Sequence, residues 1–240
     1  AGDQTAEGGR MNTEIVSYMS DDPFGAGREP GEQGSIEWLM ERVGCCTASR
    51  FRDVLAKLKG GGPAKARADY LWELVVERLT GQPGQHYESA AMQWGTEQES
   101  AARMAYEAAT GAMVYQTGFR RHPAIERLGG SPDGLVEPKG GFEAKCPFNS
   151  ANHLQTWLAG MPDEHTAQVQ GLMWLECADW WDFCSYDPRM PPDLQLYIQR
   201  IQRDDAYIAR LEAEVIVFLG EVEALAAKLE DAAKRAKAKA

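Results

Sequence analysis

The chain has 240 residues, with 25 Lys or Arg against 36 Asp or Glu, so its formal net charge is −11. A uniformly negative surface repels phosphates, so the balance excludes a protein that binds nucleic acid or anionic membranes over its whole surface and leaves room only for a local basic groove. With 44% hydrophobic residues the composition also excludes disordered and disulfide-stapled classes.

Residues 1–34 show no hydrophobic period and contain many glycines, which predicts a flexible arm. Met11 is a candidate native start, which would make residues 1–10 an expression remnant. We expect residues 35–240 to form a single domain, since a chain of this length fits one large domain or at most two. The longest uncharged apolar stretch is far shorter than the roughly 20 residues of a membrane span, so no membrane partner is expected.

The first half of the domain reads as helical. Ser35 is a candidate N-cap for I-E-W-L-M-E-R, and Thr47 or Ser49 is a candidate cap for a second helix through Leu58. A third helix is predicted from Lys65 to about Gly81. A long fourth helix is predicted over 88–110, closed by Gly111.

The second half mixes strands and helices. Short segments rich in β-formers predict an antiparallel meander at 112–122, 126–130, 133–137 and 141–146. Helices are predicted at 149–159 and 163–178, then two strands at W-W-D-F-C-S-Y and L-Q-L-Y-I-Q-R-I, and a final helix from 204 to about 235 with a basic end. This order predicts an α/β or α+β fold with a central mixed sheet flanked by helices.

The segment S-P-D-G-L-V-E-P-K-G-G-F-E-A-K-C-P-F carries the candidate chemistry. Asp133 follows a turn, and Glu143 and Lys145 alternate on one strand, so they project from the same face. Two carboxylates and a lysine at a sheet edge suit metal-assisted hydrolysis of a phosphodiester, with the Ala144 carbonyl as a further oxygen ligand. The triplet alone is equally compatible with a solvated hairpin that carries a surface ion pair.

Six collinear segments add to this triplet. They are V-G-C-C-T-A-S-R-F, W-G-T-E-Q-E, S-P-D-G-L, E-A-K-C-P-F, A-Q-V-Q-G-L-M-W and Y-D-P-R-M, spread over about 35–200. In these segments the sequence resembles the phage lambda-type exonuclease family, the YqaJ-like viral recombinase branch of the PD-(D/E)XK nucleases. The resemblance implies a restriction-endonuclease-like core.

The resemblance also implies roles for individual residues. Asp133 and Glu143, with the Ala144 carbonyl, would bind Mg²⁺ or Mn²⁺, with two ions per site expected. Lys145 would position the attacking water and help to deprotonate it, and Glu99 would act near the second metal or its water. A pocket for a 5′-terminal phosphate would be formed by Arg42, Ser49, Ser131 and Gln168. His165 could approach DNA, although an ordinary histidine on a helix face explains it as well.

The function implied is a metal-dependent exonuclease that digests the 5′-ended strand of duplex DNA to mononucleotides and leaves 3′ overhangs for recombination. The family implies a homotrimeric ring and a single-strand annealing protein as partner, in the cytoplasm of a bacterial or phage-infected cell. Two alternatives remain. One is a repair or restriction endonuclease of the same superfamily, and the other is a non-catalytic module that binds DNA ends. The five cysteines form no C-x-x-C pair, which is typical of free thiols in a reducing compartment.

The charge is unevenly distributed along the sequence. Residues 42–79 contain eight basic and four acidic residues, a net charge of +4. A basic helical layer ahead of an acidic catalytic sheet is consistent with one wall of a DNA channel, and equally with ordinary charge variation between helices.

Overall fold

The computed structural model describes residues 31, 33–84 and 89–239, so the predicted arm lies almost wholly outside the described residues. Three helices of the first half confirm the predicted end signals at Ser35, Gly81 and Gly111. α1 (Ile36–Arg42) begins where the Ser35 side chain accepts a hydrogen bond from the Trp38 N–H. α3 (Lys65–Thr80) and α4 (Ala90–Thr110) each end at a glycine in the left-handed conformation, Gly81 and Gly111.

The second predicted helix is wrong in its extent. Its segment forms β1 (Cys46–Thr47), a 3₁₀ turn η1 (Ala48–Arg50) and the short α2 (Phe51–Val54). Thr47 precedes η1 but its side chain makes no capping hydrogen bond, and its backbone pairs with Gly129 of another strand. Ser49, the other predicted cap, lies inside η1. The chain then leaves the helix by Leu55, well before the predicted end at Leu58.

In the described part of the chain, eight strands form two sheets. The larger has the order β2 (Val114–Tyr115), β5 (Gly134–Val136), β6 (Gly140–Lys145), β7 (Trp180–Tyr186) and β8 (Leu196–Gln202). The smaller has the order β1, β4 (Leu128–Gly130) and β3 (Arg120–Arg121). Each sheet contains one parallel pair, β6 with β7 and β1 with β4, and the other pairs are antiparallel. The predicted mixed character is confirmed.

The single antiparallel meander predicted over 112–146 is wrong, because its strands divide between the two sheets. β4 turns away from β5 and pairs in parallel with β1, about 80 residues earlier in the chain. Two glycines of β4 allow neighbouring segments to pack closely against this strand. A Cβ on Gly129 would lie 2.4 Å from the Arg120 carbonyl oxygen of β3, and a Cβ on Gly130 would lie 2.9 Å from the Leu172 side chain.

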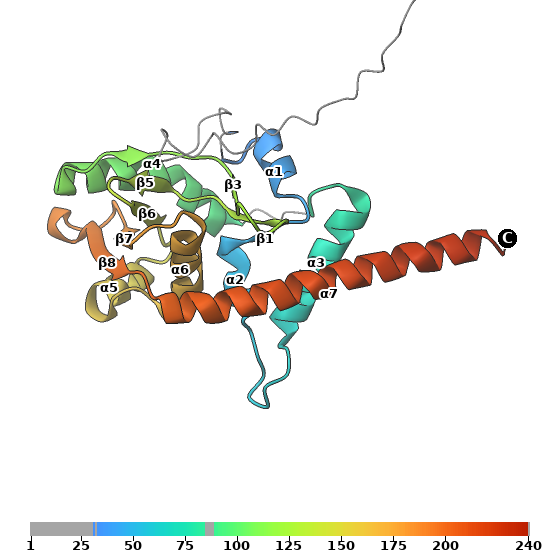
Figure 1. The fold of residues 1–240 in the computed structure, drawn as a ribbon. Helices are drawn as coiled ribbons and strands as arrows, with labels where there is room; N and C mark the ends of the chain where they lie inside the picture. Colours follow the sequence, from blue (N-terminus) through green and yellow to red (C-terminus); the bar gives the residue numbers. More distant parts are fainter. Residues whose placement is uncertain (1–30, 32, 85–88, 240) are drawn as a thin grey trace, which may run out of the picture.

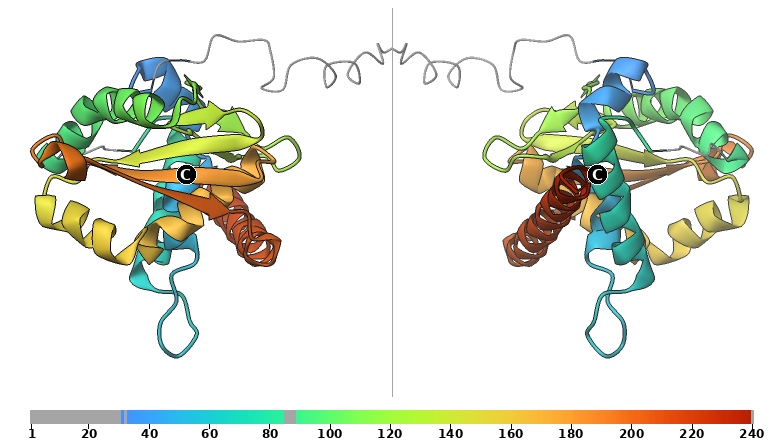
Figure 2. Two further views of the ribbon diagram at one scale, coloured as in Figure 1. Left: turned by 90° about the vertical axis from the view of Figure 1, so that its left-hand side faces the viewer. Right: turned by 90° about the vertical axis from the view of Figure 1, so that its right-hand side faces the viewer.

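The larger sheet lies between two layers of helices (Figures 1 and 2). α4 covers one face, and α5 (Ser150–Ala159) and α6 (Thr166–Leu175) cover the other. The parallel β6–β7 connection needs a crossover, which α5, the turn η2 (Asp163–His165) and α6 provide. Alternate residues of the central strands therefore enter different clusters: Phe142 and Cys184 pack toward α4, whereas Trp181 and Phe183 pack toward α6.

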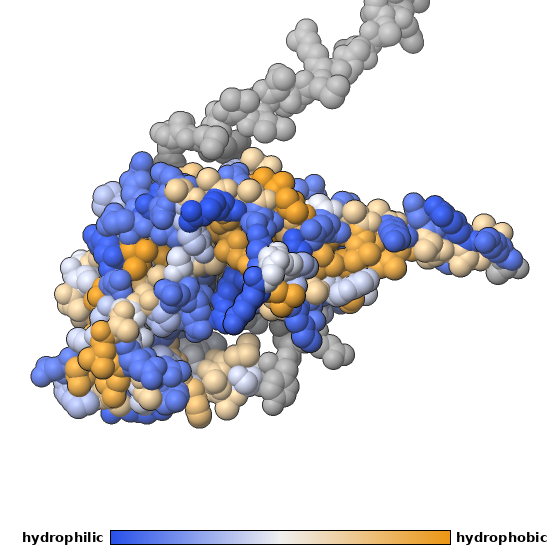
Figure 3. All heavy atoms as spheres, turned by 90° about the horizontal axis from the view of Figure 1, so that it is seen from below, coloured by the Kyte–Doolittle hydropathy of each residue, from blue (hydrophilic) through white to orange (hydrophobic). Residues whose placement is uncertain are grey.

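The last helix, α7 (Asp205–Lys237), follows β8 and the turn η3 (Pro192–Leu194) and runs along α3 and past the body of the molecule (Figure 1). Its buried side chains are Ile208, Leu211, Val215, Phe218, Leu219, Val222 and Ala226. Seen from below in Figure 3, the projecting end carries hydrophilic and small residues. Within the described part of the chain, every helix is too short or too polar to span a bilayer.

α7 also supplies carboxylates that pair with basic residues of the segment 42–79. Six of its eight cations are engaged in ion pairs, and three of these pairs are made to α7: Lys57 with Glu214, Arg67 with Glu221 and Arg78 with Glu223. The local charge count missed these acidic partners because they lie about 150 residues away in the sequence. Many basic side chains of the predicted DNA-channel wall therefore lie at the edge of the contact between α3 and α7.

Candidate active site

The register of β5 and β6 brings the predicted carboxylates together. Gly134 pairs with Phe142, so one further step of the same antiparallel register places Asp133 opposite Glu143. Asp133 Oδ2 accepts a hydrogen bond of 2.8 Å from the Ala144 N–H. Lys145 Nζ donates to Glu143 Oε1 from two residues further along β6. The structure therefore unites the predicted triplet.

Glu143 lies beneath the surface of the site, only 1% exposed. Its Oε1 also accepts a hydrogen bond of 2.6 Å from Gln168 Nε2 on α6. Its Oε2 is buried and has no hydrogen-bond partner among the described residues. A buried carboxylate oxygen without a partner is costly, so this atom is a ready ligand for a cation.

Burial and the charge of Glu143 shift the pKa values of the neighbouring side chains. Burial raises the pKa of Asp133 well above its ordinary value, and the charge of Glu143 raises it further. Burial and the same charge raise the pKa of Glu99. Burial alone would lower the pKa of Lys145, but the charges of Glu143 and Asp133 outweigh it and hold that pKa above its ordinary value. The Lys145 side chain therefore stays an ammonium, and the crowded carboxylates favour a bound cation.

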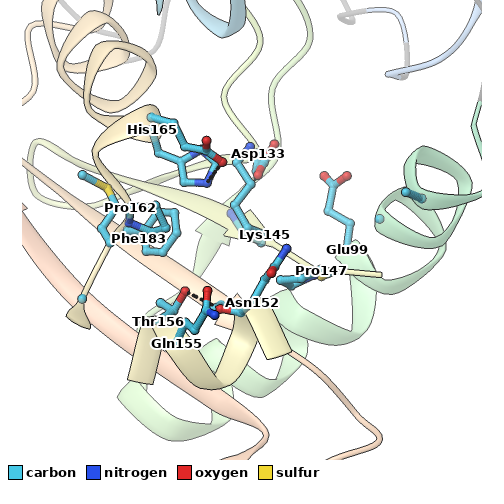
Figure 4. Close-up of a pocket in the computed structure, with 18 of the residues that line it drawn as sticks. Glu99, Asp133, Lys145, Pro147, Asn152, Gln155, Thr156, Pro162, His165 and Phe183 are labelled. Carbon is cyan, nitrogen blue, oxygen red and sulfur yellow. Dashed lines mark hydrogen bonds and ion pairs between the residues drawn. The ribbon is translucent and has the colours of Figure 1, made fainter. Parts of the chain in front are cut away.

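A cleft of about 1040 Å³ opens over these residues (Figure 4). Asp133 and Lys145 line it from the sheet, and Glu99 faces them from α4. The helical crossover forms the remaining wall with Asn152, Gln155, Thr156 and His165. Glu99 therefore belongs to the same cleft as the triplet, as the resemblance implies.

His165 lies at the junction of this cleft with a neighbouring cavity of about 530 Å³. Its ring stacks on Phe183 with centroids 5.4 Å apart. Burial, aided by the charges of Lys145 and Arg52, lowers the pKa of His165 to about 4. His165 is therefore a neutral imidazole near pH 7, so it can donate or accept a hydrogen bond without adding charge.

The four residues assigned to the phosphate pocket fall into two pairs. Arg42 donates to the Ser131 hydroxyl at 3.0 Å, and Trp38 donates to the same hydroxyl at 2.9 Å. Ser49 and Gln168 line the 530 Å³ cavity together with Lys145. Because β1 and β4 run parallel with Thr47 opposite Gly129, Ser49 and Ser131 leave the strand pair at the same end.

The acidic residues do not form a closed metal cage. Among the described residues, no three His, Cys, Asp or Glu side chains are grouped closely enough to hold a metal by themselves. The set that fits a hard divalent cation is Asp133, Glu143 and a backbone carbonyl such as that of Ala144, with the unpartnered Glu143 Oε2 as one ligand atom. Glu99 lies across the cleft from Asp133 and Lys145.

Comparison with known proteins agrees with this geometry. Residues 37–178 match the family model of the YqaJ-like viral recombinase domain, which is more than half of the chain. The chain belongs to the YqaJ-like viral recombinase family. This membership confirms the resemblance drawn from the six sequence segments. No curated protein sequence matches the chain significantly.

Solved structures of nucleases share the fold of this YqaJ-like chain. It is 43% identical to an alkaline exonuclease, LHK-Exo, from Laribacter hongkongensis, with a TM-score of 0.78 over 84% of this chain and 99% of that one. A second structure of LHK-Exo, in complex with dAMP, is 44% identical over the same shares, again with a TM-score of 0.78. A phage-related exonuclease from Haemophilus somnus is 18% identical, with a TM-score of 0.62 over 77% of this chain and 96% of that one, which shows a shared fold. The fold is restriction-endonuclease-like, as predicted.

Sequence reasoning missed part of the YqaJ-like cleft. Asn152, Gln155 and Thr156 were not predicted as site residues, although their spacing of three and four residues places them on one face of α5. This polar face was detectable in the sequence. The sequence could not show that this face of α5 lies toward the end of β6, the strand that carries Glu143 and Lys145.

Proposed function

We propose that the protein is a metal-dependent exonuclease that hydrolyses the 5′-ended strand of duplex DNA to mononucleotides and leaves a 3′ overhang. The observation that carries the proposal is the convergence of Asp133, Glu143 and Lys145 on one sheet face, where Asp133 and Lys145 line a large cleft and Glu143 lies beneath them. The 43% identity to an alkaline exonuclease over 84% of the chain supports it.

Asp133 and Glu143, with the Ala144 carbonyl, would hold Mg²⁺, or Mn²⁺ in its place, and Glu99 would serve a second ion or its water. Such an ion, when bound, stabilises negative charge on phosphate oxygens and lowers the pKa of bound water. The Lys145 ammonium donates hydrogen bonds, so it orients the attacking water and stabilises the developing charge. Gln168 holds the Glu143 carboxylate in place through its 2.6 Å hydrogen bond.

Recognition of the 5′ end would fall to Arg42, Ser131, Ser49 and Gln168. The Arg42 guanidinium can donate two parallel hydrogen bonds to a phosphate, and the two hydroxyls and the amide complete a neutral donor set. Holding the terminal phosphate places the next phosphodiester over Asp133 and Lys145. The arrangement supports cleavage from a 5′-phosphorylated end, one nucleotide at a time.

Partners follow from the same proposal. We expect a homotrimeric ring around the DNA and a single-strand annealing protein that receives the 3′ overhang. The net charge of −11 is compatible with such a ring, because an acidic exterior releases DNA while local donors in the cleft bind it.

The test is a strand-resolved digestion assay with a Mg²⁺ titration. The substrates are a linear duplex with a 5′ phosphate, the same duplex with a 5′ hydroxyl, and a closed circle. We expect rapid release of mononucleotides from the phosphorylated end, slower release from the hydroxyl end and none from the circle. Cutting of the circle would instead identify an endonuclease, and duplex binding without metal-stimulated turnover would identify a non-catalytic module. In Arg42→Gln the two linear duplexes should be digested at similar rates.

A further inference from the structure

A third cavity, also of about 530 Å³ and distinct from the one lined by Ser49 and Gln168, adjoins the catalytic cleft on its α4 side. Both are lined by Thr96 and Glu99, so they meet at the Glu99 carboxylate. The outer wall of this α4-side cavity is formed by the segment after β2, at Gln116 and Thr117. No role proposed above uses it.

Arg103 lies in this cavity, on the same face of α4 as Glu99 and one turn further along. Four residues of helix span about 6 Å. Nine other arginines of the described residues are ion-paired with a carboxylate. The half-buried Arg103 makes no hydrogen bond and no ion pair with any described residue. The Arg103 guanidinium interacts with the charge of Glu99 but forms no ion pair with it, so it is available to bind an anion.

The other lining groups suit the same ligand. Ser100 lies three residues before Arg103 on the helix, and Thr117 brings a second hydroxyl from the opposite wall. Gln116 adds an amide. A planar guanidinium with neighbouring hydroxyl donors matches the oxygens of a phosphodiester, and among the described residues Glu99 is the only acidic one that lines the cavity.

We propose that Arg103, assisted by Ser100 and Thr117, binds a backbone phosphate of the DNA next to the one that is cleaved. Holding this phosphate keeps the strand aligned over Asp133 and Lys145 on the side away from Ser49 and Gln168. The proposal rests on the nuclease function and names one more contact of its substrate.

The test combines Arg103→Gln with substrates that carry one uncharged methylphosphonate linkage, moved stepwise from the 5′ end along each strand. We expect Arg103→Gln to digest the natural duplex about tenfold more slowly, as suits loss of a charge-assisted hydrogen bond. At one linkage, the neutral substitution should slow the wild-type enzyme about tenfold and leave Arg103→Gln unaffected. If the two effects multiply at every linkage, Arg103 does not contact a backbone phosphate and the proposal is overturned.

Arg210→Gln is the matched control, because Arg210 is exposed on α7 and lines none of the three cavities. Any effect of Arg210→Gln on the digestion rate should multiply with the effect of the methylphosphonate at every linkage. If Arg103→Gln fails to fold by circular dichroism, the double variant Ser100→Ala with Thr117→Val takes its place. It should slow the natural duplex and lose sensitivity at the same linkage.

A binding measurement separates this inference from the nuclease function. In a Lys145→Ala background, which is expected not to cleave, the affinity for duplex is measured against salt concentration. Loss of one phosphate contact should reduce the slope of log affinity against log salt by about one when Arg103→Gln is added. An unchanged slope contradicts the Arg103 site. A reduced slope in a protein whose wild-type form digests no DNA would keep the site and reject the exonuclease.

Discussion

Lys145 is the residue whose loss should separate catalysis from folding. It lies on β6 with its ammonium on Glu143, and it lines the cleft. Lys145→Ala should lower the digestion rate by a factor of about 10² to 10⁴, the range typical of a positioned proton donor or acceptor. Circular dichroism should show an intact fold. Lys139→Ala is the matched control, since Lys139 is exposed and outside the cleft. Full activity of Lys145→Ala would reject its assigned role.

Asp133 is the residue at which the proposed metal site should cost stability in the absence of metal. Because its pKa is raised in the folded protein, its ionised form destabilises the fold at neutral pH, and this penalty is removed as the pH falls through the raised pKa. Asp133→Asn keeps an oxygen that can accept from the Ala144 N–H but removes the charge. Without divalent metal we expect the variant to be more stable at pH 8 by about 1 kcal/mol, a gain typical of relieved active-site strain.

The same pair of proteins tests metal binding without any DNA. If Mg²⁺ binds the folded state as proposed, then at 100 times its dissociation constant it should stabilise the wild type by about 2.7 kcal/mol. Asp133→Asn should show little or no rise in Tm. A calorimetric scan with and without Mg²⁺ measures both effects. An equal rise in the two proteins would place the ion elsewhere.

At the scale of elements, the end of β7 is tied to the segment after β6 by an ion pair between the buried Asp187 and the exposed Arg189. Asp187 is 0% exposed and accepts two hydrogen bonds from the Arg189 guanidinium, at 2.8 Å each. Arg189 also donates to the carbonyl oxygens of Pro147 and Phe148. The pair therefore fixes the chain that leaves the catalytic strand.

This pair should make stability depend on pH. Asp187 is desolvated, but its hydrogen bonds with Arg189 and Ser150 outweigh burial and lower its pKa to about 2. A carboxyl with a lowered folded pKa stabilises the protein above its unfolded pKa of about 4, and this contribution is lost as the pH falls from about 4 to about 2. Asp187→Asn should cost about 2 kcal/mol at pH 7 by urea unfolding. The difference from wild type should vanish near pH 2, and a difference that persisted there would contradict a charge effect.

Local signals predicted some elements and not others. Ser35, Gly81 and Gly111 predicted helix ends because capping depends on only a few neighbouring residues. The pairing of β1 with β4 could not be predicted, because a two-residue strand has no period and its partner is about 80 residues away. The alternation of Glu143 and Lys145 predicted their shared face, but only the β5–β6 register shows that Asp133 lies opposite Glu143.

At the scale of the whole molecule, distant pairs decide what the charges do. The sequence predicted a basic layer at 42–79, yet α7 supplies carboxylates that neutralise half of its paired cations. The unpaired Arg103 was missed because nothing in its own neighbourhood distinguishes it from the other arginines. In this chain the local charge count was a poor guide to DNA contacts, and the pairing of each cation in the fold is the better one.

α7 divides into a part that completes the core and a part that projects beyond it. Phe218 is 0% exposed and stacks on Tyr70 of α3 at 5.4 Å, whereas residues 227–239 are all exposed. Removal of residues 228–240 should therefore change stability by less than about 1 kcal/mol, which corresponds to a shift in Tm of under about 4 °C. Digestion of a phosphorylated duplex should continue at the full-length rate.

A deeper truncation supplies the contrast. Ending the chain after Glu214 removes the buried Val215, Phe218, Leu219 and Val222 and the ion pairs of Glu221 and Glu223. Each large buried side chain contributes about 2 to 5 kcal/mol, so together they exceed the roughly 5 to 15 kcal/mol of a typical domain. This form should not fold, as measured by the loss of a cooperative thermal transition. If the shorter truncation also unfolded, the projecting half of α7 would have to pack against another surface, and a second copy of the chain would be the first to test by sedimentation.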